Sequence, residues 1–242
     1  MKIGLLGYGK MGREIEAVAK QRSHSISAVA DVDSNLGTMK EEFDSCDVLS
    51  DFSTASAVLG HVEFAVSLKK PVVIGTTGWQ KDMTEAANKI AKHETAAVVG
   101  SNFSLGENLF ISTVEKAAKL FGQFDGFDCA VLESHHNQKA DAPSGTALML
   151  ANAIIDNFPS KAKIRTGLPD GKIAKEELHV SSVRVGSDFG THSVFFDSEN
   201  DSIELKHISR GRRGLALGAL LAAEWVIGKK GFYQFREILS EL

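Results

Sequence analysis

The segment ESHHNQKADAPSGTA, from Glu133 to Ala147, gathers proton carriers and anion-binding groups within fifteen residues. Histidine changes its charge near neutral pH, and the segment holds two adjacent histidines, His135 and His136. Lys139 adds a positive charge and a possible proton donor. Neighbouring side chains on an extended strand point to opposite faces, so the two histidines are expected to have different roles. The segment therefore predicts a place where an anionic molecule is held and protonated.

The same segment ends in Ser-Gly-Thr, which is typical of the start of a helix. Ser144 is a suitable N-cap, and Gly145 and Thr146 would then offer N–H groups and a hydroxyl to an anion. A solvated loop before a capped helix would explain this tripeptide alone, but not the histidines and lysine beside it. A metal centre built from the histidines and Asp141 fits no standard zinc spacing, so no metal is predicted. We expect a receptor for a dicarboxylate.

A second chemical signal lies near the N-terminus, where GYGKMG occupies residues 7–12. This G-x-G-x-x-G motif follows an apolar, strand-like run and opens a helical one, the context that indicates dinucleotide binding. Gly7 would permit the tight turn, Gly9 would let the backbone approach a pyrophosphate, and Gly12 would let helix and strand pack closely. Asp31, nineteen residues after Gly12, would bind the adenine ribose. The alternative is a glycine-rich turn without a ligand.

Two further loops follow predicted strands, GTTGW at 75–79 and SNFS at 101–104. Ligands of such sheets bind beyond the carboxyl ends of the strands. The hydroxyl side chains of these loops would bond ribose and carboxamide groups, and Phe103 would cover a ring of the ligand. The alternative is that both are ordinary polar loops. Asp31 favours NAD, whereas Lys10 would reach the 2′-phosphate of NADP, so use of both NADH and NADPH is expected.

These groups need a scaffold, and the first hundred residues predict one. Short apolar runs predict strands at 2–7, 26–31, 47–52, 71–75 and 96–100, and longer segments predict helices at 11–21, 54–69 and 80–93. Nearly unbroken apolar strands that alternate with helices indicate a parallel sheet covered on both faces. Ser53 or Thr54 would cap the second helix.

The pattern changes from about residue 104. Helices are predicted at about 106–122 and 145–157, and strands at 127–134, 178–186, 191–198 and 201–209, the last two joined by a turn at Glu199-Asn200. Hairpin-linked strands indicate an antiparallel or mixed α+β domain. From residue 213 the chain reads as helical again, over 213–228 and 232–242.

We therefore predict an α/β fold with two domains and hinges near 103–105 and 209–213. Residues 1–104 and 212–242 would form a Rossmann-type, doubly wound parallel sheet that binds a dinucleotide. Residues 105–211 would form a second α+β domain for substrate binding and oligomerisation.

Composition limits the remaining classes. The 242 residues include 24% charged residues with a net charge of −4, so the chain has no electrostatic footprint for nucleic acid. No apolar stretch reaches about 18 residues, and no membrane span is predicted. Cys46 and Cys129 lie in apolar runs, which favours free thiols in a reducing compartment, and the N-terminus lacks the features of a signal peptide. A cytoplasmic protein is expected.

The segment 133–147 resembles the E-x-H-H-x-x-K-x-D-x-P-S-G-T-A signature of the dihydrodipicolinate reductase family, also named 4-hydroxy-tetrahydrodipicolinate reductase. GYGKMG, DFS, GTTG, NFS-x-G and a late Ser-Arg region occur in family order along the whole chain. The resemblance implies a two-domain homotetrameric enzyme of bacterial lysine and diaminopimelate biosynthesis. It would reduce a cyclic dicarboxylate with NADH or NADPH.

The resemblance also implies roles for single residues. His135 would be the catalytic proton donor/acceptor and Lys139 the catalytic proton donor. The substrate-binding residues would be His136, Gly145, Thr146 and Arg212. The cofactor positions would be Gly7, Tyr8, Gly9, Lys10, Met11, Gly12, Asp31, Gly75, Thr76, Thr77, Ser101, Asn102, Phe103 and Ser104. Val32 replaces the arginine that often follows the ribose-binding acidic residue, which leaves the preference between NADH and NADPH open. Arg210 is an alternative to Arg212.

Two other functions are compatible with the glycine motif. Another two-domain nicotinamide-dependent dehydrogenase would share the Rossmann-type domain, since a fold does not define a reaction. A non-catalytic dinucleotide-sensing protein would need the cofactor loop but not the His-His-Lys group. It would also need an interaction module, which the sequence does not reveal.

Overall fold

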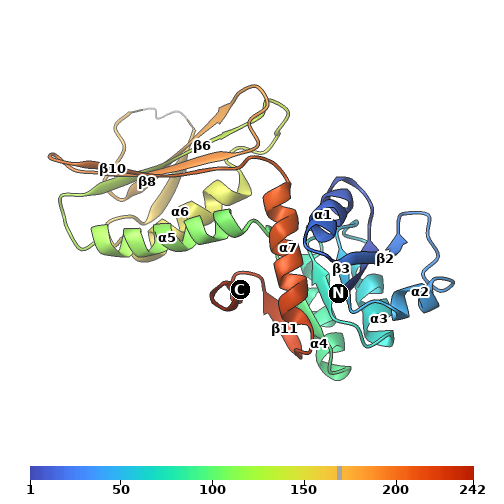
Figure 1. Ribbon diagram of the computed structural model, residues 1–242. Coiled ribbons are helices and arrows are strands. Elements are labelled where there is room, and N and C mark those ends of the chain that lie inside the picture. The colour runs from blue at the N-terminus through green and yellow to red at the C-terminus, as the bar shows by residue number, and fades with distance from the viewer. Residues whose placement is uncertain (168–170) are drawn as a thin grey trace. The chain divides into compact units, whose positions relative to one another are not determined.

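The computed structural model describes residues 1–167 and 171–242, and the chain forms two compact units (Figure 1). Unit 1 comprises Met1–Leu105 and Arg212–Leu242, and unit 2 comprises Gly106–Gly211. Unit 2 is thus inserted between two parts of unit 1. Among the described residues, no helix has the length and apolar character needed to cross a lipid bilayer.

Unit 1 is built on a parallel sheet of six strands in the order β11-β5-β4-β3-β1-β2. The strands are β1 (Lys2–Leu6), β2 (Ser25–Ala30), β3 (Val48–Asp51), β4 (Val72–Ile74), β5 (Ala96–Val99) and β11 (Gly231–Gln234). Every residue of β3, β4 and β5 is buried, as expected for parallel strands covered on both faces. The predicted Rossmann-type sheet is confirmed.

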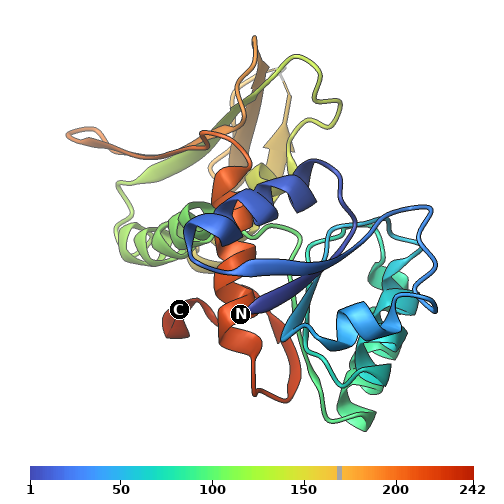
Figure 2. The same ribbon diagram turned by 45° about the vertical axis from the view of Figure 1, so that its right-hand side comes forward.

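Helices cover both faces of this sheet (Figures 1 and 2). One face packs against α1 (Lys10–Gln21) and α7 (Arg213–Val226). The other packs against α2 (Lys40–Asp44), α3 (Val58–Ser67) and α4 (Met83–Lys92), which follows the 3₁₀ turn η1 (Gln80–Asp82). Two apolar cores therefore hold the strand ends in place.

Helix α7 lies very close to the loop after β5. A Cβ atom added at Gly218 would lie 1.7 Å from the carbonyl oxygen of Phe103. The Phe103 ring is buried, with its centroid 4.6 Å from that of Phe235 and 5.9 Å from that of Phe52. Only glycine at residue 218 allows the helix this approach.

Unit 2 contains a mixed sheet of five strands in the order β10-β9-β6-β8-β7. The strands are β6 (Asp128–His135), β7 (Lys163–Thr166), β8 (Glu177–Arg184), β9 (Thr191–Asp197) and β10 (Ser202–Ile208). Strand β6 runs parallel to β8 and antiparallel to β9. Helices α5 (Leu105–Phe121) and α6 (Gly145–Asn157) lie along one face (Figure 1). The predicted α+β architecture is confirmed.

The other face of the unit 2 sheet is apolar in part. Side chains alternate between the two faces of a strand, so the buried Val131 on β6 is followed by Leu132 on the opposite face. Leu132 is 37% exposed, and Val183 on β8 is 46% exposed. We call this surface, which includes Ala130, Leu132, Val183 and Phe195, the outer sheet face.

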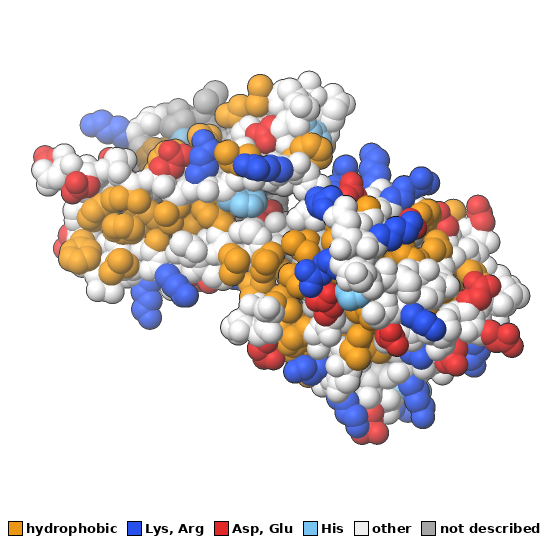
Figure 3. All heavy atoms as spheres, viewed as in Figure 1, with side chains coloured by type: hydrophobic (Ala, Val, Ile, Leu, Met, Phe, Trp, Pro, Cys, Tyr) orange, Lys and Arg blue, Asp and Glu red, His pale blue; other side chains and the backbone are white. Residues whose placement is uncertain are grey.

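Charged side chains of both signs are mixed over the face of the molecule that Figure 3 shows. Two ion pairs of the described residues join neighbouring turns of a helix, Lys20 with Glu16 at 2.7 Å and Lys89 with Glu85 at 3.2 Å.

The C-terminal segment differs from the prediction. A helix over 232–242 is wrong, because this segment contains strand β11 and the 3₁₀ turn η2 (Leu239–Glu241). The N–H of Gly231 donates to the carbonyl of Thr95, and β11 then pairs with β5. The edge of a sheet thus supplies backbone partners that the local pattern of apolar residues does not reveal.

Three smaller differences concern elements of both units. Helix α2 and strand β7 were not predicted, since α2 has only five residues and β7 only four. The cap predicted at Ser53 or Thr54 is wrong, because α3 begins at Val58 after Ala57 and has no side-chain cap. Ser53 instead donates its hydroxyl to Asp51.

Candidate active site and dinucleotide pocket

The glycine loop of unit 1 has the backbone that the motif requires. Gly7 has a φ of +97°, and a Cβ atom there would lie 2.6 Å from the carbonyl oxygen of Phe52. A Cβ atom on Gly12 would lie 2.5 Å from the carbonyl oxygen of Gly7, so α1 packs directly on the loop. Gly9, the N-cap of α1, has open space beside it. The exposed start of this helix fits a pyrophosphate, because its N–H groups and dipole favour an anion.

Tyr8, Lys10 and Met11 lie between these glycines and differ in their exposure. Tyr8 donates its hydroxyl to Glu16, and the guanidinium carbon of Arg13 lies 5.2 Å from the Tyr8 ring centroid. The hydrogen bond with Glu16 raises the pKa of Tyr8. Met11 packs against the core, whereas Lys10 is exposed. Lys10 is therefore the charged residue of the loop that is open to a phosphate.

A cavity of about 320 Å³ lies beside the glycine loop. Its lining consists of Gly7, Gly9, Ala30, Asp31, Val32, Ser34, Leu36, Phe52, Ser53, Thr54, Ala57 and His61. Asp31 is exposed at the end of β2, and one of its carboxylate oxygens accepts from the N–H of Val32 at 2.9 Å. The glycine loop predicted to bind the pyrophosphate and the aspartate predicted to bind the ribose therefore line the same cavity.

Asp51, which the sequence analysis did not single out, fastens the neighbouring loops. It is fully buried at the end of β3. One carboxylate oxygen accepts from the hydroxyls of Ser53 at 2.7 Å and Thr76 at 2.8 Å, and the other lies 2.8 Å from Nδ1 of His61. The Thr76 hydroxyl therefore anchors the loop at 75–79 through a buried hydrogen bond to Asp51. In the sequence, the only feature that pointed to Asp51 was the DFS motif at residues 51–53.

The loops after β4 and β5 border a second, smaller cavity of about 190 Å³. Thr76, Thr77 and Ser101 are among the residues that line it. A Cβ atom on Gly75 would lie 2.0 Å from the Phe52 ring, which explains the glycine. Asn102 Oδ1 accepts from the N–H of Ser104 at 2.7 Å and shapes the second loop.

The role expected of the Phe103 ring is wrong. Its side chain is 1% exposed and packs within the core of unit 1, so the ring does not reach a ligand. Phe103 was predicted to contact a ligand because its neighbours in the sequence are small polar residues, which are typical of an exposed loop. The structure uses it to anchor the loop under α7.

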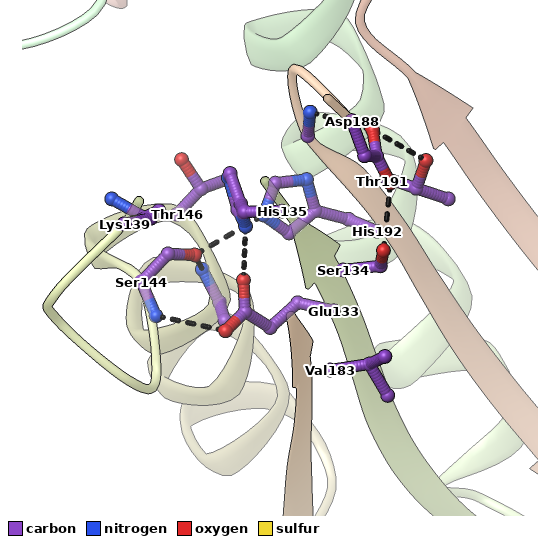
Figure 4. A network of polar contacts seen from close by, with 12 residues as sticks. Glu133, Ser134, His135, Lys139, Ser144, Thr146, Val183, Asp188, Thr191 and His192 are labelled. Carbon is purple, nitrogen blue, oxygen red and sulfur yellow. Dashed lines mark hydrogen bonds and ion pairs between the residues drawn. The ribbon is translucent and has the colours of Figure 1, made fainter. Parts of the chain in front are cut away.

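In unit 2 the two histidines differ in position, as predicted. His135 ends β6 and is 8% exposed, with its Nδ1 against Oε2 of the fully buried Glu133 (Figure 4). His136 is half-buried in the following loop, and its N–H donates to the carbonyl of Asp188 at 2.7 Å. Each histidine is thus held by a different partner.

Lys139 lies in the loop that follows. Its Nζ donates to both carboxylate oxygens of Asp141, at 2.8 and 2.9 Å. This hydrogen bond lowers the pKa of Asp141, against a smaller contribution from burial. The ammonium group is therefore compensated by a neighbouring carboxylate that is largely exposed.

Helix α6 begins as predicted. Ser144 is its N-cap, and the Ser144 hydroxyl accepts from the N–H of Ala147 at 3.2 Å. Gly145 is exposed with open space beside it, which leaves the helix start accessible to an anion. Thr146 donates its hydroxyl to the buried Glu107. A hydroxyl expected to face a ligand thus has a partner within unit 2.

Several residues of this site were not found from the sequence. Glu133 accepts from Arg184 at 2.8 Å, and Ser134 donates to Asp188 at 2.7 Å. His192 places its Nε2 3.3 Å from the Ser144 hydroxyl, and burial lowers the pKa of His192 to about 4. The residues that sequence reasoning missed are Arg184 on β8, Asp188 in the loop after it and His192 on β9, all far from the signature in sequence.

Arg212 belongs to unit 1, where it is the exposed N-cap of α7. Arg210 belongs to unit 2 and is also exposed. Neither side chain takes part in the contacts described above for the dinucleotide cavity or for the site around Glu133 and His135. Their role in substrate binding stays a prediction.

Glu133, His135 and His192 place ligand-type atoms within 4.8 Å of one another. This is not the trio considered in the sequence, because His192 takes the place of His136 and Glu133 that of Asp141. The Arg184 guanidinium already neutralises Glu133 from 2.8 Å, which disfavours a divalent cation beside it. The arrangement fits a hydrogen-bonded network better than a metal centre.

The comparisons with known proteins agree with the geometry. Sequence profiles described as "Dihydrodipicolinate reductase, N-terminus" and "Dihydrodipicolinate reductase, C-terminus" match residues 1–103 and 106–239. A 4-hydroxy-tetrahydrodipicolinate reductase of Christiangramia forsetii is 36% identical over 100% of this chain and 99% of its own length. One of Caldanaerobacter subterraneus subsp. tengcongensis is 36% identical over 96% of this chain and 95% of its own length.

A solved structure shares the fold. It is dipicolinate-bound dihydrodipicolinate reductase from a Paenisporosarcina species, with a TM-score of 0.82 at 24% identity. The match covers 98% of this chain and 99% of that one.

Proposed function

The chain belongs to the dihydrodipicolinate reductase family, and from this premise we propose how its two units perform the reaction. It is an NAD(P)H-dependent reductase of lysine and diaminopimelate biosynthesis. We propose that 4-hydroxy-tetrahydrodipicolinate, a reduced nicotinamide dinucleotide and a proton give tetrahydrodipicolinate, the oxidised dinucleotide and water. Dihydrodipicolinate would be the species reduced. When bound, the dinucleotide would supply the hydride for ring C4.

The observation that carries this proposal is the convergence of three groups in unit 2. The proton carrier His135, the Lys139 loop and the start of α6 all contact the ion pair between the buried Glu133 and the half-buried Arg184. The helix start, through Gly145 and Thr146, would hold one substrate carboxylate. His136 and Arg212 would provide further contacts to the anionic substrate.

Protonation follows from the same arrangement. Hydride addition to C4 increases the negative charge toward the ring nitrogen and C3 of the substrate. Cationic donors that already point at this charge stabilise the transition state. Lys139 or His135 would then deliver the proton, and general acid catalysis of this kind is worth about 10²–10⁴-fold.

The test of the proposed function is a direct assay. Purified protein should oxidise NADH and NADPH when the substrate is generated in situ, and the loss of absorbance of the reduced nicotinamide reports the rate. If the protein binds the dinucleotides but oxidises neither NADH nor NADPH in this assay, the proposed function is wrong.

We propose that Asp31 selects the dinucleotide. Its carboxylate would accept from ribose hydroxyls and repel a 2′-phosphate. Val32, 85% exposed, offers no charge to receive that phosphate. We therefore expect the chain to use both dinucleotides and to bind NADH more tightly.

Asp31→Ala should weaken NADH binding by about 10–100-fold, the value of hydrogen bonds to a charged group, and should change NADPH binding little or improve it. Titration of each dinucleotide into the protein measures both Kd values. Asp33→Ala is the matched control, because Asp33 is exposed nearby but does not line the cavity. Equal weakening of both dinucleotides by Asp31→Ala would contradict this role.

We also propose that unit 2 forms the contacts of a homotetramer through its outer sheet face. An exposed apolar surface on a sheet favours association with a partner. Leu132→Glu together with Val183→Glu should convert the assembly to smaller species, because buried carboxylates would lack partners. Light scattering after size-exclusion chromatography measures the mass, and Leu120→Glu, on an exposed position of α5, is the control. A monomeric wild-type chain would refute the proposal.

A cytoplasmic location is proposed as well. Cys46 and Cys129 are both free and buried, and burial raises the pKa of the Cys129 thiol to about 12. Unpaired buried thiols suit a reducing compartment.

A further inference from the structure

Glu133 is a fully buried carboxylate in the middle of the signature site. Its Oε1 accepts from Arg184 Nη2 at 2.8 Å and from the N–H of Ser144 at 3.3 Å, while Oε2 lies against Nδ1 of His135. Figure 4 shows Glu133 between the end of β6 and the start of α6. One side chain thus joins the histidine, the helix start and an arginine of another strand.

Glu133 is held in its ionised form. Burial acts to raise its pKa, but hydrogen bonds from Ser182 and Arg184 and the charges of His135 and Arg184 together lower it. An ionised carboxylate can only accept hydrogen bonds, so the proton between Glu133 and His135 belongs to Nδ1 of the imidazole. Nε2 is then the nitrogen of His135 that can exchange a proton with a ligand.

On the other side of the ring, Nε2 of His135 faces the turn at Gly190. A Cβ atom at Gly190 would lie 2.9 Å from Nε2 of His135, and Gly190 has a φ of +141°. The N–H of Gly190 donates to Asp188 at 2.9 Å, which fixes this turn. The imidazole is therefore oriented by a carboxylate on one side and accommodated by a glycine on the other.

Arg184 extends this arrangement to the lysine loop. Its guanidinium donates to the carbonyl oxygens of Lys139 at 3.3 Å and Asp141 at 2.6 Å, as well as to Glu133. Arg184 is paired with His135 across the parallel strands β6 and β8. Because a guanidinium has five N–H donors in a rigid plane, it can hold all three acceptors at once.

We propose, on the premise of the function above, that Glu133 and Arg184 are positioning residues for proton transfer. Glu133 fixes the orientation and tautomer of the His135 imidazole, with Nε2 as the nitrogen that remains for proton transfer. Arg184 keeps the loop of Lys139 at the same place. The pair therefore aligns both proton donors with the carboxylate-binding start of α6, without contact to the substrate.

Glu133→Gln tests the first half of this proposal. The amide is the same size but can donate to Nδ1, which would move the imidazole proton to Nε2. We expect kcat to fall about tenfold with little change in the substrate KM, as for the loss of one charged contact to the imidazole. The pH dependence of kcat should also change, because the side chain that faces the imidazole has lost its charge. Glu133→Asp should recover part of kcat.

Arg184→Lys tests the second half. A lysine keeps the charge but cannot hold the carbonyls of residues 139 and 141 together, so Lys139 should be misplaced and kcat should fall more than the substrate KM rises. Glu177→Gln is the matched control, since Glu177 pairs with Arg165 at 3.2 Å on the same sheet, away from the signature. This control should keep kcat, KM and the pH profile of the wild type.

The outcomes separate the proposals. If the wild type fails to oxidise NADH or NADPH, the proposed function itself fails. If the wild type is active and Glu133→Gln keeps its kcat and pH profile, the positioning role is wrong and the function stands. If circular dichroism shows that Glu133→Gln does not fold, Glu133→Asp and Arg184→Lys decide: a wild-type kcat and pH profile in both would overturn the role.

Discussion

Replacing Lys139 by Met should lower kcat by about 100-fold or more, the scale expected when a general acid is lost. The substrate KM should change less, because a donor that acts in the transition state contributes mainly to kcat. His135→Ala should reduce kcat to a similar extent, since the nitrogen opposite its Glu133 contact is lost. Steady-state oxidation of NADH with substrate generated in situ measures both variants.

Two variants serve as references for this experiment. Lys116→Met removes an exposed lysine of α5 and should leave both constants unchanged. His136→Ala should mainly raise KM, since we assign His136 to substrate binding. Near-normal kcat in both Lys139→Met and His135→Ala would mean that the segment only binds substrate, and that the proton comes from water or another residue.

Gly218→Ala should produce the largest loss of stability of any single methyl group added to unit 1. The new Cβ would lie 1.7 Å from the carbonyl oxygen of Phe103, and a backbone atom under a buried ring cannot rotate away. Overpacking costs about 1–3 kcal/mol and sometimes more, and we expect at least the upper end here. For a chain of this size, about 3 kcal/mol lowers Tm by roughly 6–12 °C.

The same helix supplies the control. At Gly214 the nearest atom to an added Cβ is the Ser104 hydroxyl, at 3.7 Å, which is an ordinary contact. Gly214→Ala should be neutral or stabilising by up to about 1 kcal/mol, because alanine favours a helix over glycine. Thermal unfolding of both variants, followed by circular dichroism, measures the difference. Equal Tm values would show that α7 can move away from Phe103.

The sequence predicted those parts of the fold that depend on local patterns. The buried strands of unit 1 read as apolar runs because both faces of a parallel sheet are covered. Helix α6 was predicted over 145–157, with its N-cap at Ser144, because a serine before a helical pattern is a strong local signal. The glycine loop was recognised for the same reason, since its constraints lie within six residues.

Other features depend on which segments meet in space. The pair of Glu133 and Arg184 exists because β6 and β8 align His135 with Arg184, a register that no local pattern gives. Strand β11 was mistaken for a helix because its partner β5 lies more than a hundred residues earlier. The ring of Phe103 was placed on the surface because α7, which covers it, belongs to a distant part of the chain.

The insertion of unit 2 into unit 1 has a consequence for synthesis on the ribosome. Chains emerge from the N-terminus and fold domain by domain as they are made, at about 5–20 residues per second. Residues 1–105 emerge first, but the core on the α1 side also needs Ala216–Val226 and the buried Phe235 and Ile238. Unit 2 can therefore be fully synthesised and folded while the α1 side of the unit 1 sheet is still exposed to solvent. The first unit to begin folding is the last to finish, and its unfinished face is the part of the nascent chain that most needs chaperone protection.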